Sequence, residues 1–312
     1  AIVVGNDNAE DVIERYIDGT PEPIISKITD DRSLRTHILS VIVTHPGIKK
    51  DDLLGFFLQT LGGVQSSKAS VKFAISISLR FLTSQDMVVA KGDRYAATEF
   101  GQKTSMLYLD PYTATNFKKA IISASKKRKH TLGFLHVLTS AEEFFPKFYM
   151  RNADYENASH IIERHSGELF EHISEYDCSR SMIALYHWIA ESSELLLSEN
   201  FGIESGDMHR MMENADRLVY CMREIAKHAE RADLLDELDL LRMRLKYGIK
   251  EELLDLVKLK GIGRVRARAL YRHKICNLED LEKVPVKKLA GIDKIGTILA
   301  GKIKVELRRT RH

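Results

Sequence analysis

The sequence predicts a mainly α-helical protein with one small β-hairpin. Apolar residues recur at the helical spacings of three and four through most of the 312 residues. Alternation typical of strands is confined to MVVAKGDRYAATEFG (87–101), where two short β-prone runs flank a Lys91-Gly92-Asp93 turn. A chain of this length is too large for one ordinary core, so two or three domains are expected.

The first residues predict a remnant of another domain. AIVVG (1–5) is typical of the end of a buried strand, and NAEDVIERYIDG (8–19) of a helix. A single strand and helix cannot bury their own faces, so we expect residues 1–29 to be the end of a larger α/β domain followed by a linker. The prolines of TPEPII (20–25) favour an extended linker.

Residues 30–110 contain three helical patterns followed by the hairpin, which is the order of a winged helix. The third helix of such domains often enters the DNA major groove. Here its basic residues are only Lys68, Lys72 and Arg80, which favours packing over base reading. The apolar positions that mark this helix are Val71, Phe73, Ala74, Ile77, Leu79 and Leu82.

Residues 111–243 predict a bundle made only of helices. The expected segments lie near 112–127, 131–139, 153–175, 179–199 and 205–231. The last segment has an apolar face rich in methionine, and its opposite face is expected to carry Arg210, Asn214, Arg217, Cys221 and Glu224. Arg210 and Arg217 are seven residues apart, so they project from one side about 10 Å apart and could contact one nucleic-acid strand. A solvated polar face is the commoner explanation of such a stripe.

Charge is divided unevenly along the chain. Residues 244–312 carry 19 Lys and Arg against 8 Asp and Glu, whereas the preceding 243 residues carry 28 against 36. The total of +3 therefore conceals a basic C-terminal module beside a mildly acidic body. Such segregation indicates a polyanionic partner. A membrane is not expected as partner, because no apolar run approaches the length of a bilayer span.

The most informative motif is VKLKGIGRVRARALYRHK (257–274), which predicts a helix, a glycine turn and an arginine-rich helix. In the turn, Gly261 and Gly263 flank Ile262, and the second helix begins at about Arg264. Its free first-turn N–H groups favour an anion, and Arg264, Arg266 and Arg268 add positive charge. A glycine cap before a solvated basic helix fits GIG about equally well, but the surrounding charge favours a phosphate site.

A looser copy follows in LAGIDKIGTILAGKI (289–303), with a turn from Gly291 to Gly296. After it comes a basic tail with Arg308, Arg309 and Arg311. Paired units of this kind resemble helix-hairpin-helix DNA-binding domains. The sequence therefore predicts a helix-hairpin-helix module for residues 244–312.

No catalytic, metal or cofactor site is predicted for the chain itself. The sequence contains neither G-x-x-x-x-G-K-[ST] nor a DExH-type box, so no segment is expected to bind ATP phosphates. Cys178, Cys221 and Cys276 are widely separated without a CxxC, which predicts a reducing cytoplasm and no zinc site. The histidines lack the spacing of a helical metal pair, and Trp188 is expected in the core.

Five segments together resemble the C-terminal half of the archaeal superfamily-two DNA helicases of the Holliday-junction-migration (Hjm) type, relatives of the Ski-type RNA helicases. They are YIDGTPEPIISKI, LRTHILSVI, MLYLDPYTA, GIESGDMHRMMENADRL and YGIKEELLDLVKLKGIGRVRARALY. The resemblance implies a second RecA-like domain remnant and linker (1–29), a winged helix (30–110), a helical ratchet domain (111–243) and a helix-hairpin-helix domain (244–312). Two RecA-like ATPase domains, with ATP and Mg²⁺, would precede them in the full-length parent.

The resemblance also implies a function. It identifies the chain as the strand-guiding part of an ATP-dependent 3′-to-5′ DNA helicase that acts on forked or branched DNA in repair and replication restart. The implied partners are single-stranded and forked DNA and the RecA-like domains of the same chain, with the protein a monomer. The terminal domain of the family holds the emerging strand and acts as a brake, which assigns phosphate contacts to Gly261, Ile262, Gly263 and the three arginines after them.

The ratchet helix of the family contacts bases through an arginine and an aromatic residue. Arg210 matches the arginine, whereas Arg217 occupies the aromatic position. A guanidinium plane can stack on a base with less area than indole, so this departure implies a weaker or differently tuned contact. Arg308, Arg309 and Arg311 resemble the arginine-rich end through which these enzymes are restrained.

Two alternatives remain open at this point. The chain could be part of a Ski-type RNA helicase, which shares the architecture, although the helix-hairpin-helix motif favours DNA. It could also be a non-enzymatic nucleic-acid-binding adaptor that uses its winged helix to bind proteins.

Overall fold

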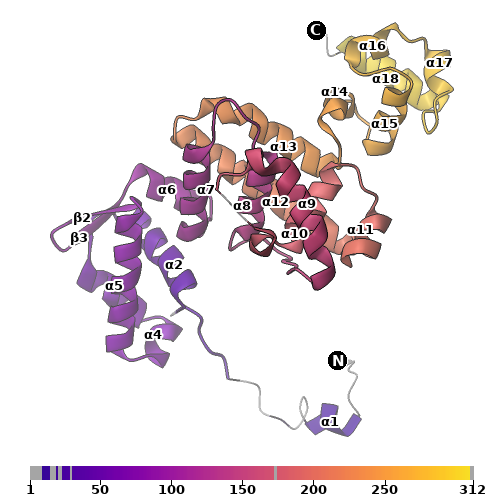
Figure 1. The fold of residues 1–312 in the computed structure, drawn as a ribbon. Coiled ribbons are helices and arrows are strands. Elements are labelled where there is room, and N and C mark those ends of the chain that lie inside the picture. Colours follow the sequence, from indigo (N-terminus) through magenta and orange to yellow (C-terminus); the bar gives the residue numbers. More distant parts are fainter. Residues whose placement is uncertain (1–8, 15–18, 20–22, 29, 172–173, 310–312) are drawn as a thin grey trace. The chain divides into compact units, whose positions relative to one another are not determined.

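The computed structural model describes residues 9–14, 19, 23–28, 30–171 and 174–309. The chain divides into two compact units, residues 1–105 and 106–312 (Figure 1). The fold is mainly α-helical with one small antiparallel sheet, as the sequence predicts. Of the N-terminal prediction, the helix is described as α1 (Ala9–Ile13), and the strand expected at residues 1–5 lies outside the described residues.

The first unit combines short and long helices with the sheet. Its elements after α1 are α2 (Asp31–Thr44), β1 (Ile48–Lys49), α3 (Lys50–Leu58), α4 (Leu61–Gln65), α5 (Lys68–Ser84), β2 (Val88–Lys91), β3 (Arg94–Ala97) and α6 (Glu99–Met106). Side chains fix two of the helix starts. Ser67 accepts a 3.1 Å hydrogen bond from the N–H of Ser70 to cap α5, and Thr60 caps α4 in the same way.

The hairpin forms where the sequence predicts it. Strands β2 and β3 pair with Val88 opposite Ala97 and Lys91 opposite Arg94, joined by Gly92 and Asp93. Gly92 has φ +62°, which a glycine adopts without strain. The two-residue strand β1 adds to β3 and completes a three-stranded sheet in the order β1-β3-β2, an addition the sequence did not predict.

Not all the apolar residues that mark α5 are packed. Its buried residues are Val71, Ile75, Ser78, Leu79 and Leu82. Phe73 and Ile77 are 67% and 37% exposed. The helix is apolar on more than one side, so spacing alone did not fix which side is packed. Helix α5 therefore presents an outer face that combines apolar and basic side chains.

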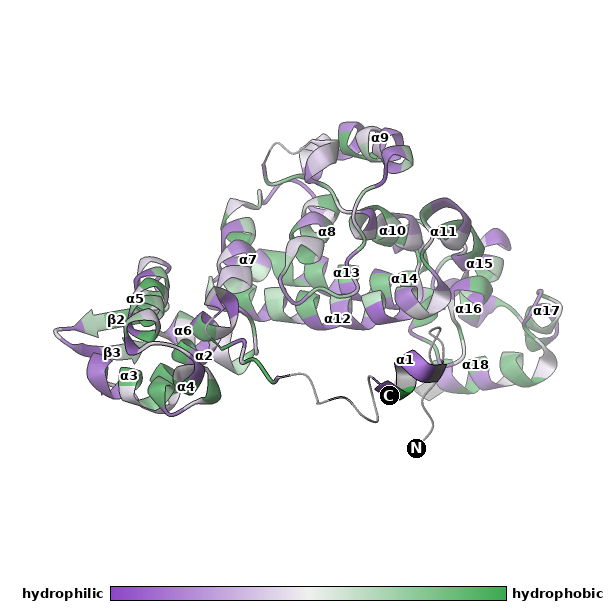
Figure 2. Ribbon diagram, turned by 90° about the horizontal axis from the view of Figure 1, so that it is seen from below, coloured by the Kyte–Doolittle hydropathy of each residue, from purple (hydrophilic) through white to green (hydrophobic). Residues whose placement is uncertain are grey.

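The second unit begins with a helical bundle. Its helices are α7 (Pro111–Ser123), α8 (Thr131–Ser140), α9 (Tyr155–His165), α10 (Arg180–Ile189), α11 (Glu194–Phe201), α12 (Ser205–His228) and α13 (Leu235–Tyr247). The long α12 packs on α7 and α13 through Met208, Met211, Leu218 and Ile225, all at most 1% exposed. Figure 2 shows hydrophilic and hydrophobic residues alternating along α12, as a helix with one packed face requires.

Two features of the bundle differ from the predicted segments. The segment expected at 179–199 is broken into α10 and α11 by residues 190–193, where Glu191 has φ +75°. Helix α13 was not predicted, and the expected domain boundary at residues 243/244 falls inside it. Helix α13 ends at Gly248, whose φ of +61° is typical of a glycine helix cap.

The rest of the second unit has its own apolar core. Its helices are α14 (Leu254–Val257), α15 (Arg264–Arg272), α16 (Leu278–Lys283), α17 (Val286–Ala290) and α18 (Thr297–Arg309). The core residues include Leu256, Ile262, Leu270, Ile295 and Ile303. Ile262 and Ile295 come from the two predicted turns, so each turn contributes a buried isoleucine to this core.

Candidate nucleic-acid interface

The first predicted turn lies between α14 and α15. Gly261 has φ +83°, and the N–H of Ile262 donates a 3.0 Å hydrogen bond to the carbonyl oxygen of Leu259. Helix α15 begins after Gly263, which has no side chain to cap its first-turn N–H groups. These N–H groups are thus left without a side-chain cap, and their binding of an anion stays a prediction. Gly261 and Gly263 are both exposed.

The second turn, between α17 and α18, repeats the first at an offset of 33 residues. The N–H of Ile295 donates to the carbonyl oxygen of Ile292 at 3.0 Å, as Ile262 does to Leu259. The residue equivalent to Gly261 is Lys294, which takes φ +59° despite its side chain. Two exposed apolar residues, Val265 and Ile298, also occupy equivalent positions at the start of the helices that follow. The looser sequence copy is thus a structural copy.

Arg266 joins the two turns. Its Nη1 donates a 2.8 Å hydrogen bond to the carbonyl oxygen of Gly261, and its Nε donates a 2.9 Å bond to that of Lys294. These are the two residues with left-handed backbone conformation. One guanidinium therefore links the two turns through one carbonyl oxygen of each.

Arg264 packs against the helical bundle. Its guanidinium lies 4.9 Å from the ring centre of Trp188 and donates to the carbonyl oxygen of Ser192. Burial lowers the pKa of Arg264, although Glu191 and Glu194 favour its charged form. Trp188 is only 7% exposed and donates from Nε1 to the carbonyl oxygen of Leu245 at 2.6 Å, which confirms its predicted core position.

Arg268 forms ion pairs with two carboxylates. Its Nε donates to Glu191 at 2.7 Å, and its Nη2 contacts both Glu191 and Glu252, the latter at 2.9 Å. Burial of the Glu191 carboxyl opposes ionisation, but hydrogen bonds from Arg268 and from the N–H of Lys250 outweigh it and lower the pKa of Glu191. Hydrogen bonding to Glu191 in turn raises the pKa of Arg268.

The three predicted phosphate-binding arginines therefore have protein partners. Arg264 and Arg268 hold the arginine-rich helix against the break between α10 and α11, and Arg266 holds the turns together. Their contacts to phosphate stay a prediction. The structure adds two exposed lysines, Lys260 and Lys294, which lie in the turns themselves and which the sequence analysis did not single out.

The basic tail is only partly described. Arg308 and Arg309 are the last residues of α18, and Arg311 lies outside the described residues.

The polar stripe of α12 is only partly as predicted. Arg210 is exposed and Arg217 is half-buried, and neither forms an ion pair with another described residue. The side-chain oxygen of Asn214 is buried without a hydrogen-bond partner among the described atoms. Cys221, predicted on this stripe, is instead 2% exposed, because the segment at Leu107 covers the helix there. Burial raises the pKa of its thiol to about 11.

Comparisons with known proteins give the family. Residues 132–248 match "Archaeal helicase, domain 4", and residues 253–309 match "SAM-like Helix-hairpin-helix tandem". The chain belongs to the archaeal DNA helicase family. The first match runs from α8 to the cap of α13 and so includes α12, and the second match includes both turns.

Curated members of this archaeal helicase family align along nearly the whole chain. ATP-dependent DNA helicase Hel308 of Thermococcus kodakarensis is 32% identical over 95% of this chain. The proteins of the same name from Pyrococcus horikoshii and Pyrobaculum calidifontis are 30% and 31% identical over 99% and 96% of it. The chain spans only 27%, 44% and 42% of these three relatives.

Neither a metal site nor a membrane-spanning helix is found in the part of the chain that the structure describes. No group of three His, Cys, Asp or Glu side chains there is arranged to hold a metal ion. No helix in that part is long and apolar enough to cross a membrane.

Proposed function

We propose that this chain is the strand-guiding portion of an ATP-dependent 3′-to-5′ DNA helicase that acts on forked or branched DNA in repair and replication restart. The observation that carries the proposal is the pair of equivalent turns held together by Arg266 in a chain of the archaeal helicase family. The ATPase motor, with its ATP and Mg²⁺, would belong to sequence that the longer relatives have and this chain does not span.

The turns suit a nucleic-acid backbone because they read no sequence. Each turn offers main-chain N–H groups at the start of a helix, and each carries one exposed lysine, Lys260 or Lys294. Backbone donors and lysines bind phosphate without regard to the base. Such contacts hold a strand in place while it moves, which is what a helicase requires of the domains that guide it.

A double variant, Lys260→Ala with Lys294→Gly, tests the turns directly. Glycine removes the lysine charge and accepts the left-handed backbone of residue 294 without strain. Binding of fluorescent single-stranded, duplex and forked DNA over a salt series should weaken for all sequences, and the slope of log affinity against log salt should fall by about 1.4 for two lost contacts.

The matched control is Lys246→Ala with Lys283→Ala, which removes the same charge from exposed positions away from the turns. An equal loss in the control and in the turn variant would reject the turns as the site. A matched RNA strand that competes as well as DNA would move the chain to the RNA helicase class instead.

The α12 stripe provides a second test within the same function. Arg210 and Arg217 are free of ion pairs among the described residues and lie on one side of the helix, so we propose that they contact successive bases of the moving strand. In a longer protein that carries the motor, Arg210→Ala with Arg217→Ala should slow unwinding more than it weakens DNA binding. Unchanged unwinding would identify the stripe as a solvated face.

A further inference from the structure

A second basic surface lies in the loop between α7 and α8. Lys126, Lys127, Arg128 and Lys129 are consecutive and all exposed. Lys129 pairs with Glu251, and Asp233 is close enough to Lys126 to interact electrostatically. Lys127 and Arg128 pair with no carboxylate of the described residues. The loop therefore presents two cations whose charge is not neutralised by a neighbour.

Both ends of this loop are fixed to the bundle. Arg231 donates to the carbonyl oxygens of Ile121 and Ala124, where α7 ends. At the other end, His130 is 3% exposed. Its ring Nε2 accepts a 3.1 Å hydrogen bond from the backbone N–H of Ser125. The backbone N–H of His130 donates to the carboxylate of Glu237. A solvated charge run needs no such anchoring, whereas a binding loop gains affinity from being held in one conformation.

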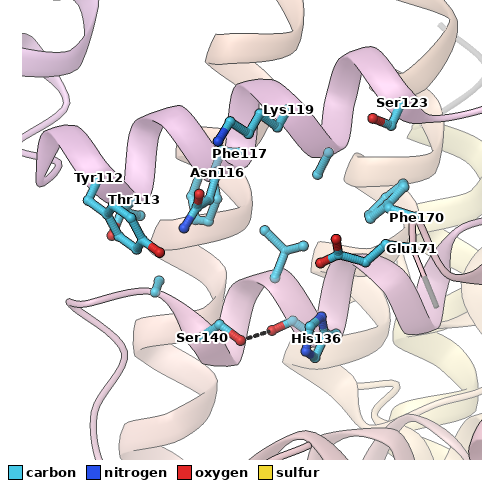
Figure 3. A pocket seen from close by; sticks show the side chains of 13 residues that line it. Tyr112, Thr113, Asn116, Phe117, Lys119, Ser123, His136, Ser140, Phe170 and Glu171 are labelled. Atoms are coloured by element: carbon cyan, nitrogen blue, oxygen red, sulfur yellow. Dashed lines mark hydrogen bonds between the residues drawn. The ribbon is translucent and has the colours of Figure 1, made fainter. Parts of the chain in front are cut away.

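A trough is lined by residues of α7 and α8 together with Phe170 and Glu171 (Figure 3). Its lining includes the apolar side chains of Phe117, Val137 and Phe170, together with polar side chains and the carboxylate of Glu171. Asn116 and Lys119 line it from α7, and neither side chain has a partner among the described residues. The volume of the trough is about 260 Å³. Sites for drug-sized ligands have volumes of about 300–1,000 Å³, so the trough suits one small planar group.

One end of the trough is close to the basic loop in the sequence. Ser123, the last residue of α7, lines the trough and precedes Lys126 by three residues. At the other end of α7, Tyr112 is 46% exposed and lines the trough as well. The distance from Tyr112 to Ser123 along the helix is about 16 Å, which is long enough for more than one nucleotide.

We propose that the loop 126–129 and the α7–α8 trough form a second binding site for single-stranded DNA. Lys126, Lys127 and Arg128 contact phosphates, and an unstacked base enters the trough, where the Asn116 amide can donate to or accept from its edge. Pairing of apolar and aromatic surface with nearby cations is how single strands are bound without sequence preference. The proposal rests on the proposed function for the identity of the ligand, but it uses no residue of the helix-hairpin-helix turns.

The first test is Lys127→Ala with Arg128→Ala, compared with the charge-matched control Lys246→Ala with Lys283→Ala. Binding of a long fluorescent single strand over a salt series should show a slope reduced by about 1.4 in the loop variant and unchanged affinity for a duplex of equal length. Unchanged melting temperature and Trp188 emission would establish that the loop variant is folded. A loop variant that binds the single strand like the control would overturn the proposal.

The second test locates the base. A single strand carrying a photoreactive halogenated uracil should crosslink to the α7–α8 trough, at residues such as Tyr112 or Phe170, and Asn116→Ala should reduce that crosslink several-fold. Crosslinks found only at residues 258–266 and 291–298 would overturn the site and leave the proposed function intact. If the turn variant Lys260→Ala with Lys294→Gly binds DNA normally while the loop variant does not, the proposed role of the turns fails and this site stands.

Discussion

Arg268 and Glu191 are 77 residues apart in the sequence and form a two-bond ion pair that holds the arginine-rich helix α15 on the break between α10 and α11. Glu191 adopts φ +75°, a conformation that costs free energy for a residue with a side chain. The ion pair and the strained backbone occur at the same residue, which indicates that the break serves to place this carboxylate.

Loss of the Glu191 charge should weaken the second unit. Glu191→Gln keeps the shape of the side chain but leaves Arg268 with Glu252 alone. Both groups of the pair are mostly buried, so we expect the free energy of unfolding in urea to fall by about 2 kcal/mol, between the values of exposed and buried pairs. Asp255→Asn, which removes the partner of the exposed Lys258, should change it by less than about 0.5 kcal/mol. Equal effects would show that the Arg268 pair contributes no more than a surface contact.

The same pair predicts how stability depends on pH. Glu191 and Glu252 have pKa values lowered in the folded state, in which hydrogen bonds from Arg268 outweigh the opposing effect of burial. A lowered folded pKa stabilises the protein above the unfolded value of about 4.3, and the stabilisation is lost as pH falls through the folded value. The difference in free energy of unfolding between the wild type and Glu191→Gln should therefore be constant near neutral pH and shrink below about pH 4. A difference that grows in acid would contradict a lowered pKa of Glu191 in the folded protein.

Gly248 should tolerate no side chain. It has φ +61°, and a Cβ atom there would lie 2.5 Å from Cε2 of Trp188. Gly248→Ala should therefore lower the free energy of unfolding by about 2 kcal/mol or more, because backbone strain and overpacking add together. Since Trp188 is the only tryptophan, its emission should shift to longer wavelength as the ring becomes exposed. Gly206→Ala, in the first turn of α12 with open space around it, should be neutral or slightly stabilising.

The three cysteines should differ in reactivity. Cys276 is exposed, whereas Cys178 and Cys221 are buried. Burial raises the pKa of Cys221 to about 11, so little thiolate is available at pH 8. Alkylation of the folded protein, followed by mass spectrometry, should modify Cys276 first and the other two only after denaturant is added. Modification of Cys221 at the rate of Cys276 would mean that the segment at Leu107 does not cover α12.

Local chemistry explains what could be predicted from the sequence. The turn at Gly261, the start of α15 and the β-hairpin depend on glycine conformation and on spacing within a few residues, and all are found as predicted. The core position of Trp188 followed from its apolar neighbours. Even the looser second turn could be recognised, although its left-handed position carries Lys294 in place of glycine.

Features that depend on distant segments could not be predicted. Ser192, the partner of Arg264, and Glu191, a partner of Arg268, lie more than 70 residues away, so the arginines looked free in the sequence. The break at 190–193 was hidden because apolar spacing continues on both sides of it. Cys221 lies on the polar side by helical spacing, and only a segment more than 100 residues earlier buries it. Ser78, a small polar residue, is buried in α5 although the sequence analysis did not name it.

Arg266 gives the two turns a common mechanical behaviour. Its guanidinium donates hydrogen bonds to the carbonyl oxygens of Gly261 and Lys294 at the same time and so links the two turns. If the two turns bind a DNA strand as we propose, tension on one turn would pass through the Arg266 guanidinium to the other and would not widen the gap between them. The spacing of the two bound phosphates would then be the same under tension as at rest.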